Sequence, residues 1–203
     1  MGFVDKQLQE YLDTLLPKLS GKLGQIQQRA YDEALPIISP HVIATLSVLL
    51  ATKRPSAVLE IGCGIGFSAA LFAGFLAAGG KVTTIERYDY MANRAEENFE
   101  KLEISDKIRL IRADAADALP DLVESGEKFD FIFMDCGKSQ YINFLTYCMK
   151  LMAIQGMMVV DDVLQSGTVS WGFEQIAKRQ RCRGWRICSS QRQAVSQAPQ
   201  SEP

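Results

Sequence analysis

Histidine is almost absent from this sequence of 203 residues, in which His41 is the only one. A single histidine excludes multi-histidine metal sites, and we expect His41 to be structural. The five cysteines form no C-x-x-C pair, so neither a zinc site nor a disulfide framework is indicated, and a reducing compartment fits best. There is no signal-peptide pattern and no run of the roughly 18 to 20 apolar residues that a membrane span needs. These absences predict a cytoplasmic protein that does not enter a membrane.

Excess charge is also lacking, because 22 basic and 24 acidic residues leave a net charge of only −2 at pH 7. This balance provides no global attraction to nucleic acid or to an anionic membrane, so any contact with a polyanion would have to be local. Hydrophobic residues make up 47% of the chain, which is enough for one core. We predict one domain over residues 1–180, with N-terminal helices at 1–52 and a binding core at 53–180.

Short apolar runs alternate with amphipathic stretches after residue 56. The runs predict strands at 57–61, 81–85, 108–111, 129–134 and 157–160, and the stretches predict helices at 67–78, 90–102, 117–124 and 141–151. This alternation indicates an α/β, Rossmann-like fold: a mostly parallel sheet with helices on both faces. Ligands bind such sheets where the carboxyl ends of the strands meet. The residues that follow each strand are therefore the candidate site.

Three helices are predicted before the first strand, at about 8–19, 25–35 and 42–51. The first carries an apolar stripe at helical spacing, formed by Leu8, Tyr11, Leu12, Leu15, Leu16 and Leu19. We expect this stripe to pack on the core of its own domain, although the face of a possible homodimer is the alternative.

A glycine loop, Gly62-Cys63-Gly64-Ile65-Gly66, follows the first strand, and Glu86 follows the second. Glycines let a backbone approach a ligand closely, and an acidic residue at this spacing can bind a ribose diol. The pair indicates an adenosine-type cofactor, either NAD or S-adenosylmethionine. The dinucleotide pattern would need glycine at position 67, where Phe67 stands, and it has no role for Glu60, so S-adenosylmethionine is favoured. Asp114 and Ala115 are expected beside the adenine, with Asp114 also a candidate helix N-cap.

Three carboxylates follow the fourth and fifth strands: Asp135, Asp161 and Asp162. Brought together at one edge of a sheet, they would repel one another unless a cation lay between them. Ligation by oxygen alone favours Mg²⁺, Mn²⁺ or Ca²⁺. The alternative is that Asp161 and Asp162 only cap a helix or form a turn. With Lys138 close in sequence to Asp135, we favour the metal site.

Together these residues resemble the cation-dependent O-methyltransferases, which include catechol and caffeoyl-CoA O-methyltransferases and bacterial tRNA 5-hydroxyuridine methyltransferases. The likeness covers about residues 11–167. Its most specific parts are the segment 36–40, Glu60 with the glycine loop, Glu86, Asp135 with Lys138, and Asp161 with Asp162. The compact segment 11–40 looks closest to the tRNA-modifying branch.

The resemblance implies a class I methyltransferase fold and a role for each matching residue. The residue matching Asp135 ligates the metal and lies beside the cofactor, those matching Asp161 and Asp162 complete the ligands, and the one matching Lys138 is the base, so Lys138 and Asp135 are the expected catalytic residues. The positions placed around S-adenosylmethionine are Ile38, Glu60, Gly62, Cys63, Ser68, Glu86, Ala115 and Asp135. Two departures matter: the family usually has Asn where this chain has Asp162, and relatives often have a larger residue at the position of Gly137.

The expected function is S-adenosylmethionine-dependent and divalent-metal-dependent O-methylation of a tRNA wobble 5-hydroxyuridine. The alternatives are O-methylation of a catechol-like small molecule, an NAD-dependent oxidoreductase, and a methyltransferase-like protein without turnover. The helical pattern ends near residue 179, and from the resemblance we expect the two final strands of the relatives to be missing. Residues 181–203, rich in Ser, Gln and Pro, are expected to be disordered. This segment is either a basic RNA-binding tail or, as we favour, an altered end without selected function.

Overall fold

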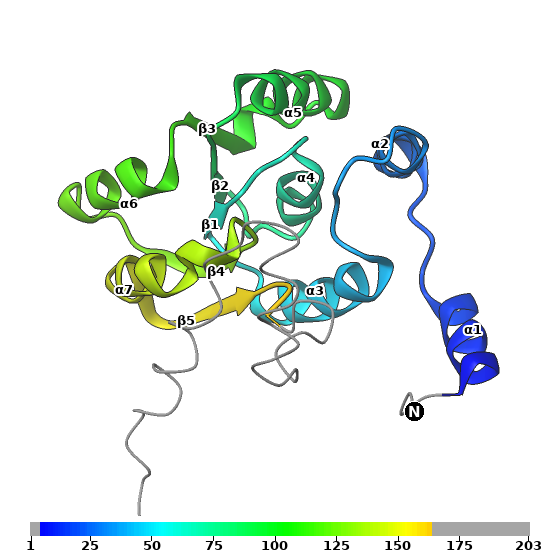
Figure 1. Ribbon diagram of the computed structural model, residues 1–203. Coiled ribbons are helices and arrows are strands. Elements are labelled where there is room, and N and C mark those ends of the chain that lie inside the picture. Colours follow the sequence, from blue (N-terminus) through cyan, green and yellow to red (C-terminus); the bar gives the residue numbers. More distant parts are fainter. Residues whose placement is uncertain (1–4, 164–203) are drawn as a thin grey trace, which may run out of the picture.

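The computed structural model of the chain describes residues 5–163 (Figure 1). Three helices come first: α1 (Lys6–Leu15), α2 (Gly21–Asp32) and α3 (Pro40–Lys53). Strands and helices then alternate as β1 (Ala57–Ile61), α4 (Phe67–Ala73), β2 (Lys81–Glu86), α5 (Asp89–Leu102), η1 (Ser105–Lys107), β3 (Ile108–Arg112), α6 (Ala115–Glu124), β4 (Phe129–Met134), η2 (Lys138–Gln140), α7 (Tyr141–Leu151) and β5 (Met152–Val160). The predicted bounds are met at both ends for β1, β4 and α7. The largest differences are in α4, which ends at Ala73, and in β5, which begins at Met152.

The strands form one parallel sheet in the order β3-β2-β1-β4-β5. From β1 the chain moves outward through β2 to β3 and then returns to the other side of β1 with β4. The order therefore reverses between β1 and β4. In an open parallel sheet, this switch point is where a crevice forms at the carboxyl ends of the strands. The predicted Rossmann-like α/β fold is confirmed.

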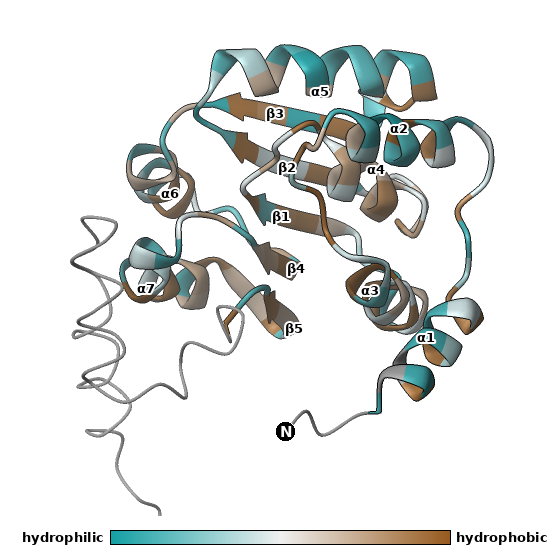
Figure 2. Ribbon diagram, turned by 45° about the vertical axis from the view of Figure 1, so that its right-hand side comes forward, coloured by the Kyte–Doolittle hydropathy of each residue, from teal (hydrophilic) through white to brown (hydrophobic). Residues whose placement is uncertain are grey.

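Helices cover both faces of the sheet (Figure 2). Alternate residues of the strands belong to the cores on opposite faces. Val58 and Phe131 belong to the core that packs under α2, α3, α4 and α5. Their neighbours Leu59 and Ile132 belong to the core that packs under α6 and α7. Burial on both faces explains why the strands read as unbroken apolar runs.

Helix α1 lies apart from the sheet, beside α3 (Figures 1 and 2). Its apolar stripe is exposed, with 49% of Leu8 and 61% of Leu15 open to solvent. The expectation that the stripe packs on the core is therefore wrong for α1. The physical reason is the connection, because the helix ends before Pro17 and the backbone is extended at Leu16 and Ser20. An ion pair between His41 and Asp13, at 3.1 Å, joins α3 to α1.

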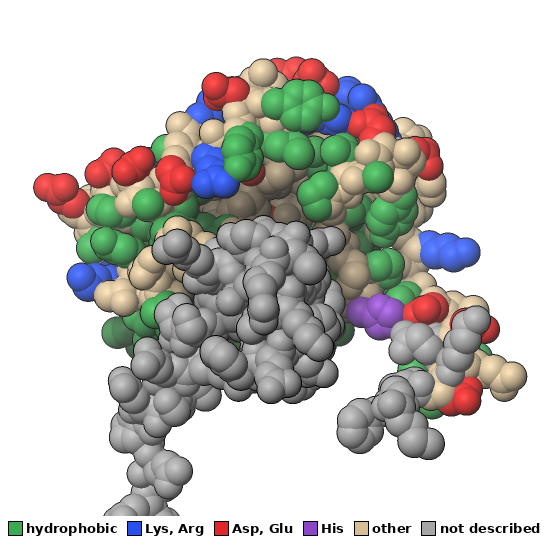
Figure 3. Space-filling view, in the orientation of Figure 1, with side chains coloured by type: hydrophobic (Ala, Val, Ile, Leu, Met, Phe, Trp, Pro, Cys, Tyr) green, Lys and Arg blue, Asp and Glu red, His purple; other side chains and the backbone are tan. Residues whose placement is uncertain are grey.

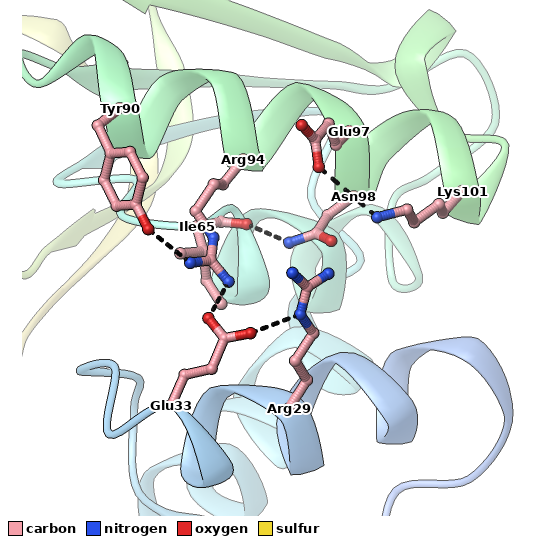
Figure 4. A network of polar contacts seen from close by, with 8 residues as sticks. All are labelled: Arg29, Glu33, Ile65, Tyr90, Arg94, Glu97, Asn98 and Lys101. Atoms are coloured by element: carbon pink, nitrogen blue, oxygen red, sulfur yellow. Dashed lines mark hydrogen bonds and ion pairs between the residues drawn. The ribbon is translucent and has the colours of Figure 1, made fainter.

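A polar network joins α2, α5 and the glycine loop (Figure 4). The carboxylate of Glu33 on α2 accepts hydrogen bonds from Arg29, at 2.7 Å, and from Arg94 on α5. These two guanidinium groups hold the pKa of Glu33 below its usual range. The buried Asn98, one turn further along α5, donates to the carbonyl of Ile65 at 2.9 Å. Helix α5 therefore contacts both α2 and the loop that follows β1.

Some predictions fall on segments without a described structure. The end of the domain at residue 180, the tail at 181–203 and the missing final strands all lie outside the described residues. The possible homodimer is not tested by a single chain and stays a prediction. Among the helices of residues 5–163, none is both long and apolar enough to cross a bilayer.

Candidate active site

The glycine loop between β1 and α4 needs its glycines for conformation and for space. Gly62, Gly64 and Gly66 have φ angles of 101°, 55° and 78°. A Cβ on Gly62 would lie 2.0 Å from the carbonyl oxygen of Asp135, which is far inside contact distance. The amide of Asp135 donates to the carbonyl of Ile61 at 3.0 Å, so the two loops are joined at the base. The loops after β1 and β4 therefore meet at the switch point.

A cavity of about 420 Å³ lies at this edge of the sheet. Eight of the nine predicted cofactor residues line it: Ile38, Gly62, Cys63, Ser68, Glu86, Asp114, Ala115 and Asp135. The structure adds residues that the sequence reasoning did not select, including Arg87, Tyr88, Met91, Cys136, Ser139, Gln140 and Phe144. Three of these, Arg87, Tyr88 and Cys136, lie within two residues of the end of β2 or β4, and the others lie in α5, η2 and α7. Position in the fold could have identified them, although their side-chain types carried no signal of their own.

Glu60 is the ninth predicted cofactor residue, and it lies beneath the cavity rather than on its wall. Its side chain is fully buried in β1 and accepts a hydrogen bond from the hydroxyl of Thr84 in β2. Among the described residues, its other oxygen, Oε1, has no partner. Burial raises the pKa of Glu60 to about 8. The hydroxyls of Ser68 and Thr84 lower this pKa, and the negative charges of Asp135 and Glu86 raise it further. A buried carboxyl with an unused oxygen suits a cationic ligand group in the cavity above it.

Glu86, at the end of β2, is held by the backbone on both sides. One carboxylate oxygen accepts from the amide of Gly64 at 2.8 Å, and the other from the amide of Tyr88 at 2.9 Å. Each oxygen keeps a second lone pair, which can accept a hydrogen bond from a ribose hydroxyl. The predicted role of Glu86 is therefore compatible with its position, and these bonds fix the carboxylate at the cavity wall.

Asp114 has two functions at the start of α6. Its side chain accepts from the amide of Ala116 at 2.9 Å, which makes it the N-cap that the sequence suggested. Its second oxygen accepts from Arg87 at 3.3 Å, and the guanidinium of Arg87 lies over the ring of Tyr88, 4.5 Å from the centroid. The hydrogen bond from the backbone amide of Ala116 and the neighbouring guanidinium of Arg87 hold the pKa of Asp114 below its usual range. Arg87 and Tyr88 thus form a polar rim at this side of the cavity.

Asp135 and Asp161 lie close together at the ends of β4 and β5. The amide of Asp161 donates to the carbonyl of Met134 at 3.0 Å, which brings its backbone to the start of the loop that holds Asp135. Burial raises the pKa of Asp135 to about 6, the charge of Asp161 adds to this, and Lys138 opposes it. Burial also raises the pKa of Asp161. Asp135 and Asp161, whose negative charge raises the proton affinity of Asp135, form an acidic pair beside the cavity.

Asp162 is directed elsewhere. Its carboxylate forms an ion pair with the ammonium group of Lys138, which begins η2. Its amide donates to Oδ1 of Asp161 at 2.6 Å, and its backbone is left-handed, with φ at 51°. Within residues 5–163, no group of three or more His, Cys, Asp or Glu side chains is arranged to hold a metal ion. The structure thus brings together two of the three predicted ligands and pairs the third with the predicted base.

Comparison with known families identifies the class of protein to which this fold belongs. A family model described as O-methyltransferase matches residues 19–197, which is most of the chain. The chain belongs to the O-methyltransferase family. This membership confirms the predicted class of enzyme, an S-adenosylmethionine-dependent O-methyltransferase, and it excludes the NAD-dependent oxidoreductase as the explanation of the glycine loop.

Relatives of this O-methyltransferase have names that refer to phenolic compounds. The caffeoyl-CoA O-methyltransferase of Stellaria longipes is 28% identical over 172 residues, which cover 81% of this chain and 71% of that protein. The catechol O-methyltransferase of Niastella koreensis is 29% identical over 133 residues, which cover 65% of this chain and 60% of that protein. The chain therefore spans 60% to 71% of the length of these two relatives.

Solved structures of other O-methyltransferases share the fold. The enzyme TomG from Streptomyces achromogenes, in complex with SAM (S-adenosylmethionine), has 27% identity and a TM-score of 0.72, over 81% of this chain and 75% of that one. The Bacillus cereus O-methyltransferase, in complex with SAH (S-adenosylhomocysteine), has 28% identity and a TM-score of 0.71, over 79% and 74%. The fold is thus that of a class I methyltransferase, as the sequence predicts.

The residues of this O-methyltransferase fit the two expected bound groups to different degrees. The cavity, the close approach at Gly62 and the unpartnered oxygen of Glu60 suit a cationic adenosine compound such as S-adenosylmethionine. For a divalent cation, the donor chemistry fits, because hard ions prefer carboxylate oxygens. Asp135 and Asp161 are in place for it, whereas Asp162 is engaged by Lys138.

Proposed function

We propose that this protein is a divalent-cation-dependent O-methyltransferase that transfers the methyl group of S-adenosylmethionine to a small hydroxylated aromatic compound. The observation that carries the proposal is the position of Asp135. This residue lines the cofactor cavity, and it also lies close to Asp161, whose charge raises the pKa of Asp135. A single residue thus joins the two halves of the site, so that a hydroxyl held near the acidic pair would face a cofactor in the cavity.

The chemistry requires the substrate hydroxyl to lose its proton as its oxygen bonds to the methyl carbon and the sulfur–methyl bond breaks. A bound cation lowers the pKa of a hydroxyl beside it. Mg²⁺ is the expected ion, with Mn²⁺ or Ca²⁺ as alternatives, held by Asp135, Asp161 and Asp162. In this proposal Lys138 takes up the hydroxyl proton. Glu60 and Glu86 bind the cofactor, and the glycine loop orients it.

An aromatic substrate is favoured by the apolar part of the cavity wall and by the relatives. Ile37, Ile38, Met91 and Phe144 line the cavity. The two basic residues near its rim, Arg87 and Lys138, are each paired with a carboxylate. On the face in Figure 3, the visible basic side chains are scattered among acidic ones rather than gathered in one patch. A planar ring suits this wall better than a polyanion does.

A tRNA wobble 5-hydroxyuridine is the second candidate substrate. It is favoured by a run of basic residues without an intervening acid: Lys178, Arg179, Arg181, Arg183, Arg186 and Arg192. These residues lie outside the described part of the chain. A methyltransferase-like protein without turnover is the remaining alternative.

The test has two steps. Calorimetric titration with S-adenosylhomocysteine, with and without Mg²⁺, should show binding, and methyl transfer should then be measured on catechol, caffeoyl-CoA and hypomodified tRNA. Turnover of a phenol that stops in excess chelator supports the proposal, and turnover of tRNA alone selects the second candidate. Asp161→Ala should abolish both turnover and its dependence on Mg²⁺, whereas Asp121→Ala, a matched change at an exposed carboxylate of α6, should alter neither. A folded protein that binds no S-adenosylhomocysteine would refute the assignment.

A further inference from the structure

The ion pair between Lys138 and Asp162 spans the two loops that carry the acidic pair. Lys138 belongs to the segment after β4, and Asp162 to the segment after β5. The lysine side chain is 27% exposed and the aspartate side chain 44% exposed, so the contact lies at the rim of the site and open to solvent. Both residues are thus held at the place where the proposed cation and substrate would bind.

The backbone of Asp162 is bonded to the acidic pair, whereas its carboxylate is engaged by Lys138. Its amide donates to the carboxylate of Asp161, and its left-handed φ of 51° is unusual for a residue other than glycine. Asp161 in turn lies close to Asp135. The carboxylate of Asp162 itself is turned to Lys138.

The residue type at position 162 decides what this side chain can do. An asparagine amide at this position would be neutral and would bind an ammonium group only through an ordinary hydrogen bond. A carboxylate forms a charge-assisted pair with the ammonium group, and it is also a strong ligand for a hard cation. Lys138 and a divalent cation are therefore rivals for the same carboxylate.

We propose that Asp162 is a positioning residue that holds Lys138 in the cation-free protein and releases it when a divalent cation binds. The inference rests on the proposed function, because it assumes that the cation binds at Asp135 and Asp161. When Asp162 turns to the cation, the Lys138 side chain can turn to the substrate hydroxyl. The catalytic arrangement would then assemble only in the cation-loaded protein.

The first test is a double-mutant cycle on Mn²⁺ affinity, measured by electron paramagnetic resonance in the presence of S-adenosylhomocysteine. Lys138→Met should strengthen Mn²⁺ binding about fivefold, since it removes a rival worth about as much as an exposed ion pair. In the Asp162→Asn background, the same change should alter the affinity by less than about twofold. Lys128→Met, at an exposed lysine near the opposite end of β4, is the matched control and should change nothing.

The second test detects the contact itself. A carbodiimide joins an amine and a carboxylate that touch, with loss of water, and peptide mass spectrometry identifies the product. The Lys138–Asp162 cross-link should form in the cation-free protein, fall at least severalfold when Mn²⁺ is added, and be absent from Asp162→Asn. A purely structural ion pair would give the same yield with and without Mn²⁺.

The outcomes separate the inference from the function on which it rests. Equal effects of Lys138→Met in both backgrounds, or a cross-link unaffected by Mn²⁺, would overturn the inference alone. The cycle compares the unaltered protein, Lys138→Met, Asp162→Asn and the double variant. If these four proteins bind S-adenosylhomocysteine but none binds Mn²⁺, the cation site and the inference are both overturned. A folded protein that binds no S-adenosylhomocysteine would refute the methyltransferase assignment, and Mn²⁺ titration without that ligand would still decide the inference.

Discussion

The carbonyl oxygen of Asp135 lies so close to Gly62 that any side chain at position 62 would collide with it. This contact sets the width of the junction between the loops after β1 and β4. The obstacle is backbone and not a flexible side chain, so it cannot easily move aside. The junction is therefore the least tolerant point of the cofactor site.

Gly62→Ala should lower the free energy of unfolding by about 3 kcal/mol or more, because backbone strain at positive φ adds to the overpacking. S-adenosylhomocysteine binding by the folded fraction should be lost. Gly64→Ala is the matched control, since its φ is also positive but a Cβ there would meet nothing within 4 Å. Its cost should be about 1 kcal/mol. Denaturant unfolding and ligand titration of both variants provide the check, and equal losses would show that the contact with Asp135 is unimportant.

Asn98→Leu should loosen the glycine loop, because it removes the hydrogen bond to the carbonyl of Ile65 and leaves that buried group unsatisfied. The expected cost is about 1 to 3 kcal/mol in the free energy of unfolding, with weaker S-adenosylhomocysteine binding. Asn143→Leu, at an exposed asparagine of α7, is the control and should have little effect on either quantity. If Asn98→Leu changes stability but leaves ligand affinity intact, α5 supports the fold and not the loop.

The stability of the cofactor-free protein should fall as pH rises from about 4.5 to about 8, partly because of Glu60. An unfolded glutamate loses its proton near pH 4.5, whereas the buried Glu60 keeps its proton until about pH 8. Between these values the unfolded state alone gives up the proton, so rising pH favours unfolding. Glu60→Gln cannot ionise, so its melting temperature should depend less on pH over this window. Parallel curves for the two proteins would contradict a raised pKa.

Lys138→Ala should leave S-adenosylhomocysteine affinity nearly unchanged and remove most of the turnover, if this residue takes up the substrate proton. The cofactor cavity does not include the Lys138 side chain, so binding and turnover should separate. Lys128→Ala serves as the control for loss of a surface charge. Methyl transfer at saturating cofactor measures the effect, and turnover equal to that of the unaltered protein would remove Lys138 from the mechanism.

Much of the fold could be predicted from the residue pattern, and the candidate cofactor residues from that pattern together with the family resemblance. The apolar runs at β1 and β4 were predicted at both ends, because strands buried on both faces require continuous apolar sequence. The residues that follow the strands formed the site because parallel strands share one carboxyl edge. Eight of the predicted cofactor residues line one cavity for this reason, and their role in binding stays a prediction.

Other features depend on distances between segments that are remote in sequence, and only the tertiary structure decided them. The sequence predicts that Glu60 binds the cofactor. Its burial beneath the cavity follows from the packing of β1 between β2 and β4. The apolar stripe of α1 predicts burial, yet the extended connection after Leu16 leaves it exposed.

The sequence by itself determined the α/β fold, the cofactor class and the three aspartates at the edge of the sheet. The spacing of apolar residues and the residue types that follow each strand can both be read from short segments of the chain. The tertiary structure decided how those aspartates are used. It brings Asp135 close to Asp161 and pairs Asp162 with Lys138. The choice of partner depends on separation in space and on the direction of each side chain, and neither quantity is encoded in spacing along the chain.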